Sequence, residues 1–99
     1  MSKYALSGRF VAKSGKRAEL VEILLQASRE LEKDPGCLHY VISITQQPND
    51  IWVTEAWVDQ AAHDAALQPA AIRSLIQTAM PLIVSMDSQR ATQILGGKL

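Results

Sequence analysis

An α+β fold with the element order strand, helix, strand, strand, helix, strand is predicted by three features of this 99-residue sequence. Apolar residues alternate over 4–13, follow helical spacing over 16–34, and alternate again over 38–45 and 51–58. A short polar turn joins the last two strands, and helical spacing returns after them. This order matches the ferredoxin-like plan, whose antiparallel sheet carries helices on one face. We expect one domain over 1–99, because the length is typical of a single domain.

The first strand and first helix are predicted over 4–13 and 16–34. One face of the strand carries Leu6, Phe10 and Ala12. Ser14 follows the strand and is predicted to cap the helix. The helix carries an apolar stripe formed by Leu20, Leu24, Ala27 and Leu31. Pro35 and Gly36 should end it, because proline disfavours a helical residue before it and glycine permits a chain reversal.

An antiparallel hairpin is predicted from 38–45 and 51–58, which are joined by turn residues at 46–50. One face of the first strand carries Leu38, Tyr40, Ile42 and Ile44, and one face of the second carries Ile51, Val53, Glu55 and Trp57. With Tyr40, Ile42, Val53 and Trp57 present, neither hairpin face is expected to be polar enough for water. Helices can cover only one face, so we expect a homodimer whose second copy covers the other.

The remaining elements are a helix in two pieces and a last strand. Asp59 is expected to cap a short helix through Leu67, and Pro69 suits the first turn of the next helix. That helix presents Ile72, Leu75, Ile76 and Ala79 at helical spacing. Pro81 should end it, and a strand over 89–95 completes the order.

Composition argues against several classes of protein. The 10 Lys and Arg residues balance 10 Asp and Glu residues, so no net field attracts nucleic acid or an anionic membrane. No apolar run approaches the ~20 residues that span a bilayer, and no signal peptide is visible. The single cysteine, Cys37, excludes an intramolecular disulfide and fits a cytoplasmic location. We expect Cys37 to be a small buried residue.

The sequence lacks the common cofactor and nucleophile motifs. There is no G-x-G-x-x-G, no G-x-S-x-G, and no phosphate loop, since six residues separate Gly8 from Gly15 and Arg17 follows Lys16. The two histidines and one cysteine show no metal-ligand spacing. We therefore expect no metal, flavin or haem in the purified protein.

Several motifs in the same order along the chain resemble the antibiotic biosynthesis monooxygenase family. Residues 34–40 (Asp-Pro-Gly-Cys-Leu-His-Tyr) are similar to the family's (D/E)-P-G-C-L-x-Y, and 55–57 (Glu-Ala-Trp) to its E-x-W. The segments 13–16, 59–62 and 80–83 resemble its first turn, its Ala-rich helix and the end of its last helix. The resemblance implies a dimeric α+β barrel with a small hydrophobic cavity between sheet and helices. The best-known members oxygenate phenolic polyketides, anthrones or quinols without flavin, haem or metal.

The sequence departs from that family at its helical histidines. Many members carry histidines where this sequence has 65–67 (Ala-Ala-Leu) and 69–72 (Pro-Ala-Ala-Ile), and His63 lies about one turn earlier. The family's haem-degrading branch uses an Asn and a Trp at positions that match Gly8 and Ala66. We therefore do not expect haem degradation.

Eight residues are candidates for a small-molecule site. His63, Tyr40 and Trp57 are expected to be catalytic, and Phe10, Glu55, Ile72, Arg73 and Ile76 to bind substrate. His63 or Tyr40 would accept a proton, and the ordinary histidine pKa of about 6.5 suits this near neutral pH. Trp57 would pack the ring and offer its N–H. Glu55 is expected to pair with a cation such as Arg9.

The resemblance implies a cofactor-independent monooxygenase that acts on a small aromatic, phenolic or quinol substrate and molecular oxygen. Such chemistry needs a dry pocket, a proton acceptor and stabilisation of an electron-rich anion. Two alternatives stay open. One is a non-catalytic dimer that binds a small hydrophobic ligand, and the other is an isomerase or decarboxylase of a polyketide-like acid.

Overall fold

The computed structural model describes residues 2–98. Its elements are β1 (Lys3–Ala12), α1 (Arg17–Leu31), β2 (Cys37–Ile44), β3 (Asp50–Trp57), α2 (Gln60–Ala66), α3 (Ala70–Ala79), the 3-10 turn η1 (Met80–Leu82) and β4 (Ile83–Ile94). The strands form one sheet in the order β2-β3-β1-β4, and every neighbouring pair is antiparallel. The predicted α+β fold is thus confirmed.

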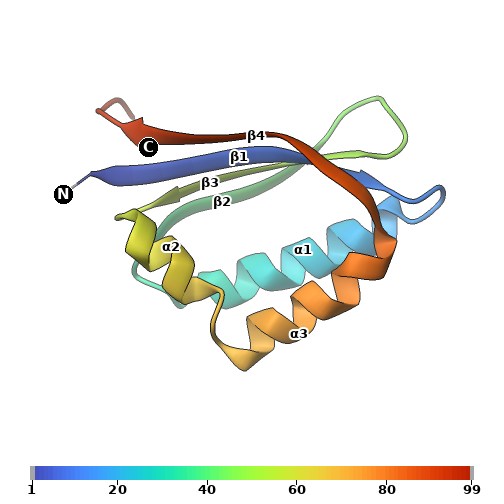
Figure 1. The fold of residues 1–99 in the computed structure, drawn as a ribbon, viewed down its shortest axis with the longest axis horizontal. Helices are drawn as coiled ribbons and strands as arrows, with labels where there is room; N and C mark the ends of the chain where they lie inside the picture. The colour runs from blue at the N-terminus through green and yellow to red at the C-terminus, as the bar shows by residue number, and fades with distance from the viewer. Residues whose placement is uncertain (1, 99) are drawn as a thin grey trace.

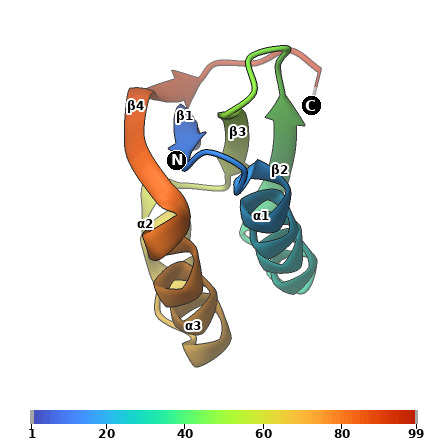
Figure 2. The ribbon, with the colours of Figure 1, turned by 90° about the vertical axis from the view of Figure 1, so that its right-hand side faces the viewer.

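The helices lie on one side of the sheet and leave the other side open (Figure 1). Viewed end-on, α1 lies under the β2 edge and α3 under the β4 edge (Figure 2). Two buried clusters fill the space between the layers. The first comprises Ala12, Leu20, Ile23, Leu24, Ile51, Val53 and Ala79, and the second Leu31, Trp57, Ala66 and Ile72.

The two predicted helix caps have opposite outcomes. Ser14 does not cap α1, because the chain first makes a turn in which Lys16 N–H donates to the Lys13 carbonyl at 2.9 Å. Lys16 therefore occupies the cap position, without a side-chain hydrogen bond. Asp59 does cap α2, since its Oδ1 accepts from the Ala62 N–H at 2.8 Å.

Strand β4 begins at Ile83, well before the start predicted at 89. Its first half pairs with β1, placing Met86 opposite Phe10 and Ile83 opposite Ala12. The alternation of side chains along β4 is interrupted at Ser88, whose φ is 54°. A strand with such an interruption does not show a continuous two-residue alternation of apolar and polar side chains. The sequence pattern therefore predicts only the second half of β4.

The four hairpin side chains expected to need a second cover all face the helices. Tyr40 lies opposite Glu55, and Ile42 lies opposite Val53 in the β2–β3 register. Tyr40, Ile42, Val53 and Trp57 therefore pack against the two core clusters. The expectation that these four side chains need a second copy of the chain as cover is therefore wrong, because the helices already cover them.

A register shift at the start of β2 changes which residue faces the core. The shift lies between Cys37 and His39, and Cys37 is paired with Trp57. Half-buried Cys37 packs against the second cluster, while Leu38 is 41% exposed. Leu38 therefore does not share the covered face with Tyr40, as simple alternation predicted.

Candidate functional site

A cavity of about 350 Å³ lies between the sheet and the helices. This volume is in the range of small-molecule sites, which are mostly apolar with a few polar groups. Most of the cavity lining is aliphatic or aromatic, and the lining comes from all four strands and all three helices. The sheet contributes its covered face, on which alternate residues of β1 and β3 point toward the helices.

The structure brings most of the predicted site residues to this cavity. The lining includes Phe10, Tyr40, Glu55, Trp57, His63, Ile72 and Ile76. Arg73 is exposed and is not part of the lining. Ile72 and Ile76 are four positions apart and share a helix face, whereas the side chain of Arg73 is turned by about 100° from that of Ile72.

Three of the lining residues with polar atoms, Glu55, Trp57 and His63, form a cluster at the α2 end of the cavity. Trp57 Nε1 donates to Glu55 Oε1 at 3.0 Å. His63 Nε2 lies 3.9 Å from the same oxygen, and the Glu55 and His63 side chains are only 15% and 16% exposed. The rings of Trp57 and His63 meet edge-on with centroids 5.6 Å apart. The three groups thus share one partly dehydrated corner.

The hydrogen bond of Trp57 revises its expected role. The indole has a single N–H donor, and that donor is directed to Glu55. Trp57 is 2% exposed and borders the cavity with its ring. In this structure it holds a carboxylate in place and is not free to donate to a ligand.

His63 has a second partner that sequence reasoning missed. Its Nδ1 lies 2.9 Å from Oδ1 of Asp64, a residue whose side chain is 64% exposed. An ionised carboxylate only accepts hydrogen bonds, so this contact favours the tautomer with the proton on Nδ1, in which the lone pair lies on Nε2. Nε2 is the nitrogen nearer Glu55 and the cavity corner. The only signal in the sequence was the adjacency of the two residues.

Burial changes the acidity of two groups in the lining. Desolvation raises the pKa of Glu55, and the Trp57 hydrogen bond and the neighbouring His63 oppose that rise. Desolvation also raises the pKa of Tyr40, and the charge of Glu55 adds to it. Tyr40 is therefore a neutral phenol near neutral pH and is unsuited to accept a proton as a phenolate.

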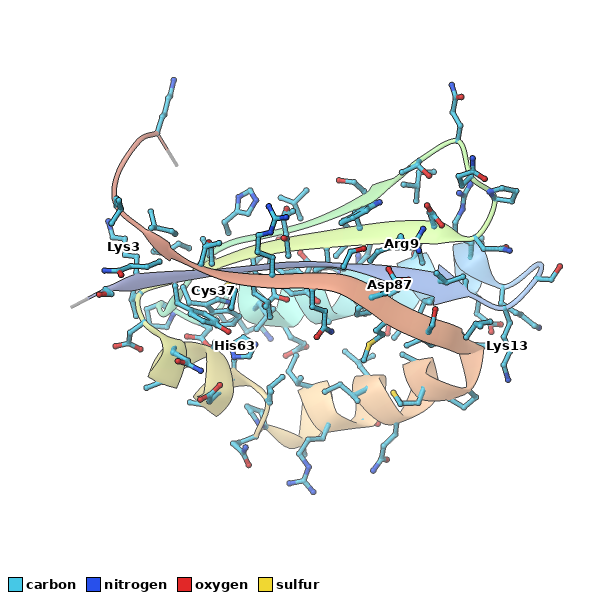
Figure 3. The ribbon with its side chains drawn as sticks, turned by 45° about the horizontal axis from the view of Figure 1, so that its top comes forward. Lys3, Arg9, Lys13, Cys37, His63 and Asp87 are labelled. Atoms are coloured by element: carbon cyan, nitrogen blue, oxygen red, sulfur yellow. The ribbon has the colours of Figure 1, made fainter. Side chains whose placement is uncertain are left out.

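Arg9 lies on the opposite side of the sheet from this cluster (Figure 3). Its guanidinium contacts Asp87 Oδ2 at 2.7 Å and Asp50 Oδ2 at 3.4 Å. The expected pair between Arg9 and Glu55 is therefore wrong. Arg9 is opposite Trp52 and Glu55 is opposite Leu6, so alternation sends the two side chains to different faces.

The position of α2 depends on a close approach to the turn that follows α1. A Cβ placed on Gly36 would lie 2.9 Å from Ala62 Cβ, so only glycine fits here without a shift. The turn is held by Gly36 N–H, which donates to Asp34 Oδ1 at 2.8 Å, and by Val58 N–H, which donates to the Gly36 carbonyl at 2.9 Å. Gly36 thereby lets α2 carry His63 to the cavity.

Two other kinds of feature are absent from residues 2–98. No group of three or more His, Cys, Asp or Glu side chains there could hold a metal ion. Within the same residues, every helix is too short or too polar to cross a membrane.

Comparisons with known proteins place this geometry in a family. The model of the antibiotic biosynthesis monooxygenase family matches residues 4–78. A Chloroflexus aurantiacus protein, provisionally described as an antibiotic biosynthesis monooxygenase, has a solved structure that is 34% identical with a TM-score of 0.90. The match covers 98% of this chain and 97% of that one. No curated protein sequence matches the chain.

More distant structures share the fold. A variant of SnoaB from Streptomyces nogalater, described as a cofactor-independent oxygenase, is 14% identical, with a TM-score of 0.83 over 98% of this chain and 97% of its own. Protein SO0527 from Shewanella oneidensis is 22% identical, with a TM-score of 0.84 over 94% of this chain and 91% of its own. With a family model that matches most of its length and a close structural relative, the chain belongs to the antibiotic biosynthesis monooxygenase family.

Proposed function

We propose that this protein is a cofactor-independent monooxygenase that acts on a small aromatic, phenolic or quinol substrate. The observation that carries the proposal is the Glu55–Trp57–His63 corner at one end of an apolar cavity. Family membership supports the reaction class, and SnoaB, a cofactor-independent oxygenase, has the same fold. A dry cavity with one proton-accepting corner is what such a reaction needs.

The proposed reaction begins with loss of the substrate's hydroxyl proton to His63 Nε2. The resulting phenolate transfers one electron to molecular oxygen, and the phenoxyl radical and superoxide combine to a peroxide at a ring carbon. Loss of water from the peroxide leaves a carbonyl at that carbon. One oxygen atom enters the product, the other leaves as water, and the two hydrogens of that water come from the substrate.

The surrounding residues would support the proton transfer. Asp64 holds the proton on Nδ1 and orients the imidazole, as carboxylates do for catalytic histidines. Glu55, 3.9 Å from Nε2, would stabilise the imidazolium that forms. Tyr40 would donate a hydrogen bond to the developing negative charge, because its raised pKa keeps the phenol protonated.

The direct experiment is incubation of the protein with a panel of naphthols, quinols and anthrones under ¹⁸O-labelled oxygen. We expect oxygen uptake with at least one compound, one labelled oxygen atom per product molecule, and one labelled water. Controls without protein correct for spontaneous oxidation. Absence of protein-dependent uptake across the panel would contradict the proposal.

A non-catalytic ligand-binding protein is the second candidate. It is favoured by Ala66 and Leu67, whose apolar side chains line the cavity. The family resemblance implies a histidine in this part of the helix. Tight binding of one panel compound without oxygen uptake would select this function.

We expect the functional unit to be a homodimer joined through the open face of the sheet. Support comes from Val41, which is 41% exposed on that face, and from the half-buried Trp52 beside Arg9. A stable homodimer would bury roughly 2,000 Å² or more in total. Sedimentation at micromolar concentration should give twice the 10.9 kDa mass of the chain.

Two charge substitutions test the location of this interface. Val41→Glu should yield the monomer, whereas Leu25→Glu, at an exposed residue of α1, should leave the dimer intact. A wild-type monomer, or a dimer that Val41→Glu leaves unchanged, would contradict the proposed interface.

A further inference from the structure

Strand β4 contains an extra residue where it crosses the cavity. Arg9 lies opposite Asp87 but Ser7 lies opposite Arg90, so Ser88 and Gln89 together face Gly8. The φ of Ser88 is 54°, a left-handed conformation that residues other than glycine rarely adopt. Two residues opposite one, with such a conformation, form a β-bulge. Bulges beside functional sites re-aim side chains, and strained residues gather there.

The bulge decides which side chains of β4 enter the cavity. Met86 lies opposite Phe10 and lines the cavity, so unbroken alternation would also turn Ser88 and Arg90 toward the helices. With the extra residue, Arg90 instead lies opposite Ser7, and Gln89 is the residue that lines the cavity. The bulge thus brings Gln89, in place of Ser88, to the position opposite Gly8, and it puts Ala91 opposite Leu6, where unbroken pairing would put Arg90.

Gly8 makes room for the redirected side chain. A Cβ on Gly8 would lie 3.2 Å from Gln89 Cγ, closer than most such contacts. Gly8 is paired with Val53, and the neighbouring covered-face pair is Leu6 with Glu55. Gln89 lies on β4, two strands away from Glu55 on β3 and two residues further along, which puts their backbones about 12 Å apart. The cavity therefore has a second polar position, separate from the first, and both side chains line it.

We infer that Gln89 is a specificity-determining residue, whose amide hydrogen-bonds to a second oxygen of an aromatic ligand while His63 receives its acidic hydroxyl. The inference rests on the proposed function for the orientation of the ligand. Gln89 is exposed in the free protein, so a ligand that covers its amide without offering a partner removes the amide's hydrogen bonds to water. Ligands with a suitably placed second oxygen are therefore favoured over those without one. Gly8 and Ser88 are positioning residues that act through Gln89.

The test compares two probes under anaerobic conditions, 1-naphthol and 1,4-dihydroxynaphthalene, by titration calorimetry. The wild type should bind the diol more tightly by about tenfold, which is the value of one net hydrogen bond. Gln89→Leu should reduce this ratio to about 1, whereas Gln77→Leu, on the exposed surface of α3, should keep it. A ratio that Gln89→Leu leaves unchanged would overturn the inference.

Gly8→Ala provides an independent variant, because it displaces Gln89 without removing the amide. It should lower the ratio in the wild-type background and have no further effect on the ratio in Gln89→Leu. Equal effects in both backgrounds would show that Gly8 acts through cavity size, against the inference. Thermal melts confirm that each variant is folded.

The outcomes separate this inference from the proposed function. Binding with the expected ratio but no oxygen uptake would contradict the monooxygenase and support Gln89. Oxygen uptake with an unchanged ratio in Gln89→Leu would support the monooxygenase and contradict the role of Gln89. Binding of neither probe by the wild type would count against both.

Discussion

The covered and open faces of the sheet are built from alternate residues of the same strands, but their carboxylates differ in burial and in charge pairing. On the covered face, Glu55 is 15% exposed and accepts a hydrogen bond from Trp57, and no Lys or Arg of residues 2–98 forms a salt bridge with it. On the open face, Asp87 is 41% exposed and paired with Arg9 at 2.7 Å. Burial raises the pKa of Glu55, whereas the hydrogen bond from Arg9 lowers the pKa of Asp87. The covered face thus holds a carboxylate whose pKa is raised by burial, and the open face holds an ion pair whose carboxylate has a lowered pKa.

The largest effect on stability is expected from truncating the covered face. Ile51 is fully buried, whereas its cross-strand neighbour Ile44 is 55% exposed. Ile51→Ala should lower the free energy of unfolding by about 2–5 kcal/mol, because it removes buried methyl groups and leaves a cavity. Ile44→Ala should change it by no more than about 0.5 kcal/mol. Denaturant titrations of the two variants give both values, and similar losses would contradict the difference in burial between these two side chains of the covered face.

A smaller effect of opposite sign is expected at the bulge. Ser88→Gly relieves a left-handed conformation and should raise Tm by about 4–8 °C, which corresponds to about 1 kcal/mol in a domain of this size. Thr92→Gly, in the regular part of β4, should instead lower Tm, because glycine weakens a strand interior. A lower Tm in both variants would show that Ser88 is not strained.

The smallest expected effect is on the pH dependence of stability. Because burial raises the pKa of Glu55, the folded state holds this proton more tightly than the unfolded state. The resulting stability is present below the ordinary glutamate pKa and is lost as pH rises through the folded value. Glu55→Gln should remove this loss, while Glu19→Gln on α1 should retain it. Denaturant titrations between pH 4 and 8 measure the two slopes, and a wild-type slope in Glu55→Gln would contradict the account.

The element order could be predicted from the sequence because the apolar period changes clearly between strands and helices. The relation between the two hairpin strands could not, since alternation gives the faces of each strand but not the register between them. Tyr40 and Glu55 share a side only because the turn aligns them. Trp57 and His63 were recognised singly, but their corner depends on the close approach of α2 at Gly36. Gln89 was missed because the bulge at Ser88 leaves no periodic signal.

The most direct test of the central claim compares the two histidines of the chain on the two faces of the sheet. His63 lines the cavity, whereas His39 is exposed and contacts Thr54 Oγ1 at 3.4 Å on the open face. With the panel compound that the wild type oxidises fastest, His63→Ala should lower the rate of oxygen uptake by about 10²-fold, the usual contribution of a general base. His39→Ala should retain the wild-type rate. Wild-type activity in His63→Ala, or equal losses in both variants, would contradict His63 as the proton acceptor.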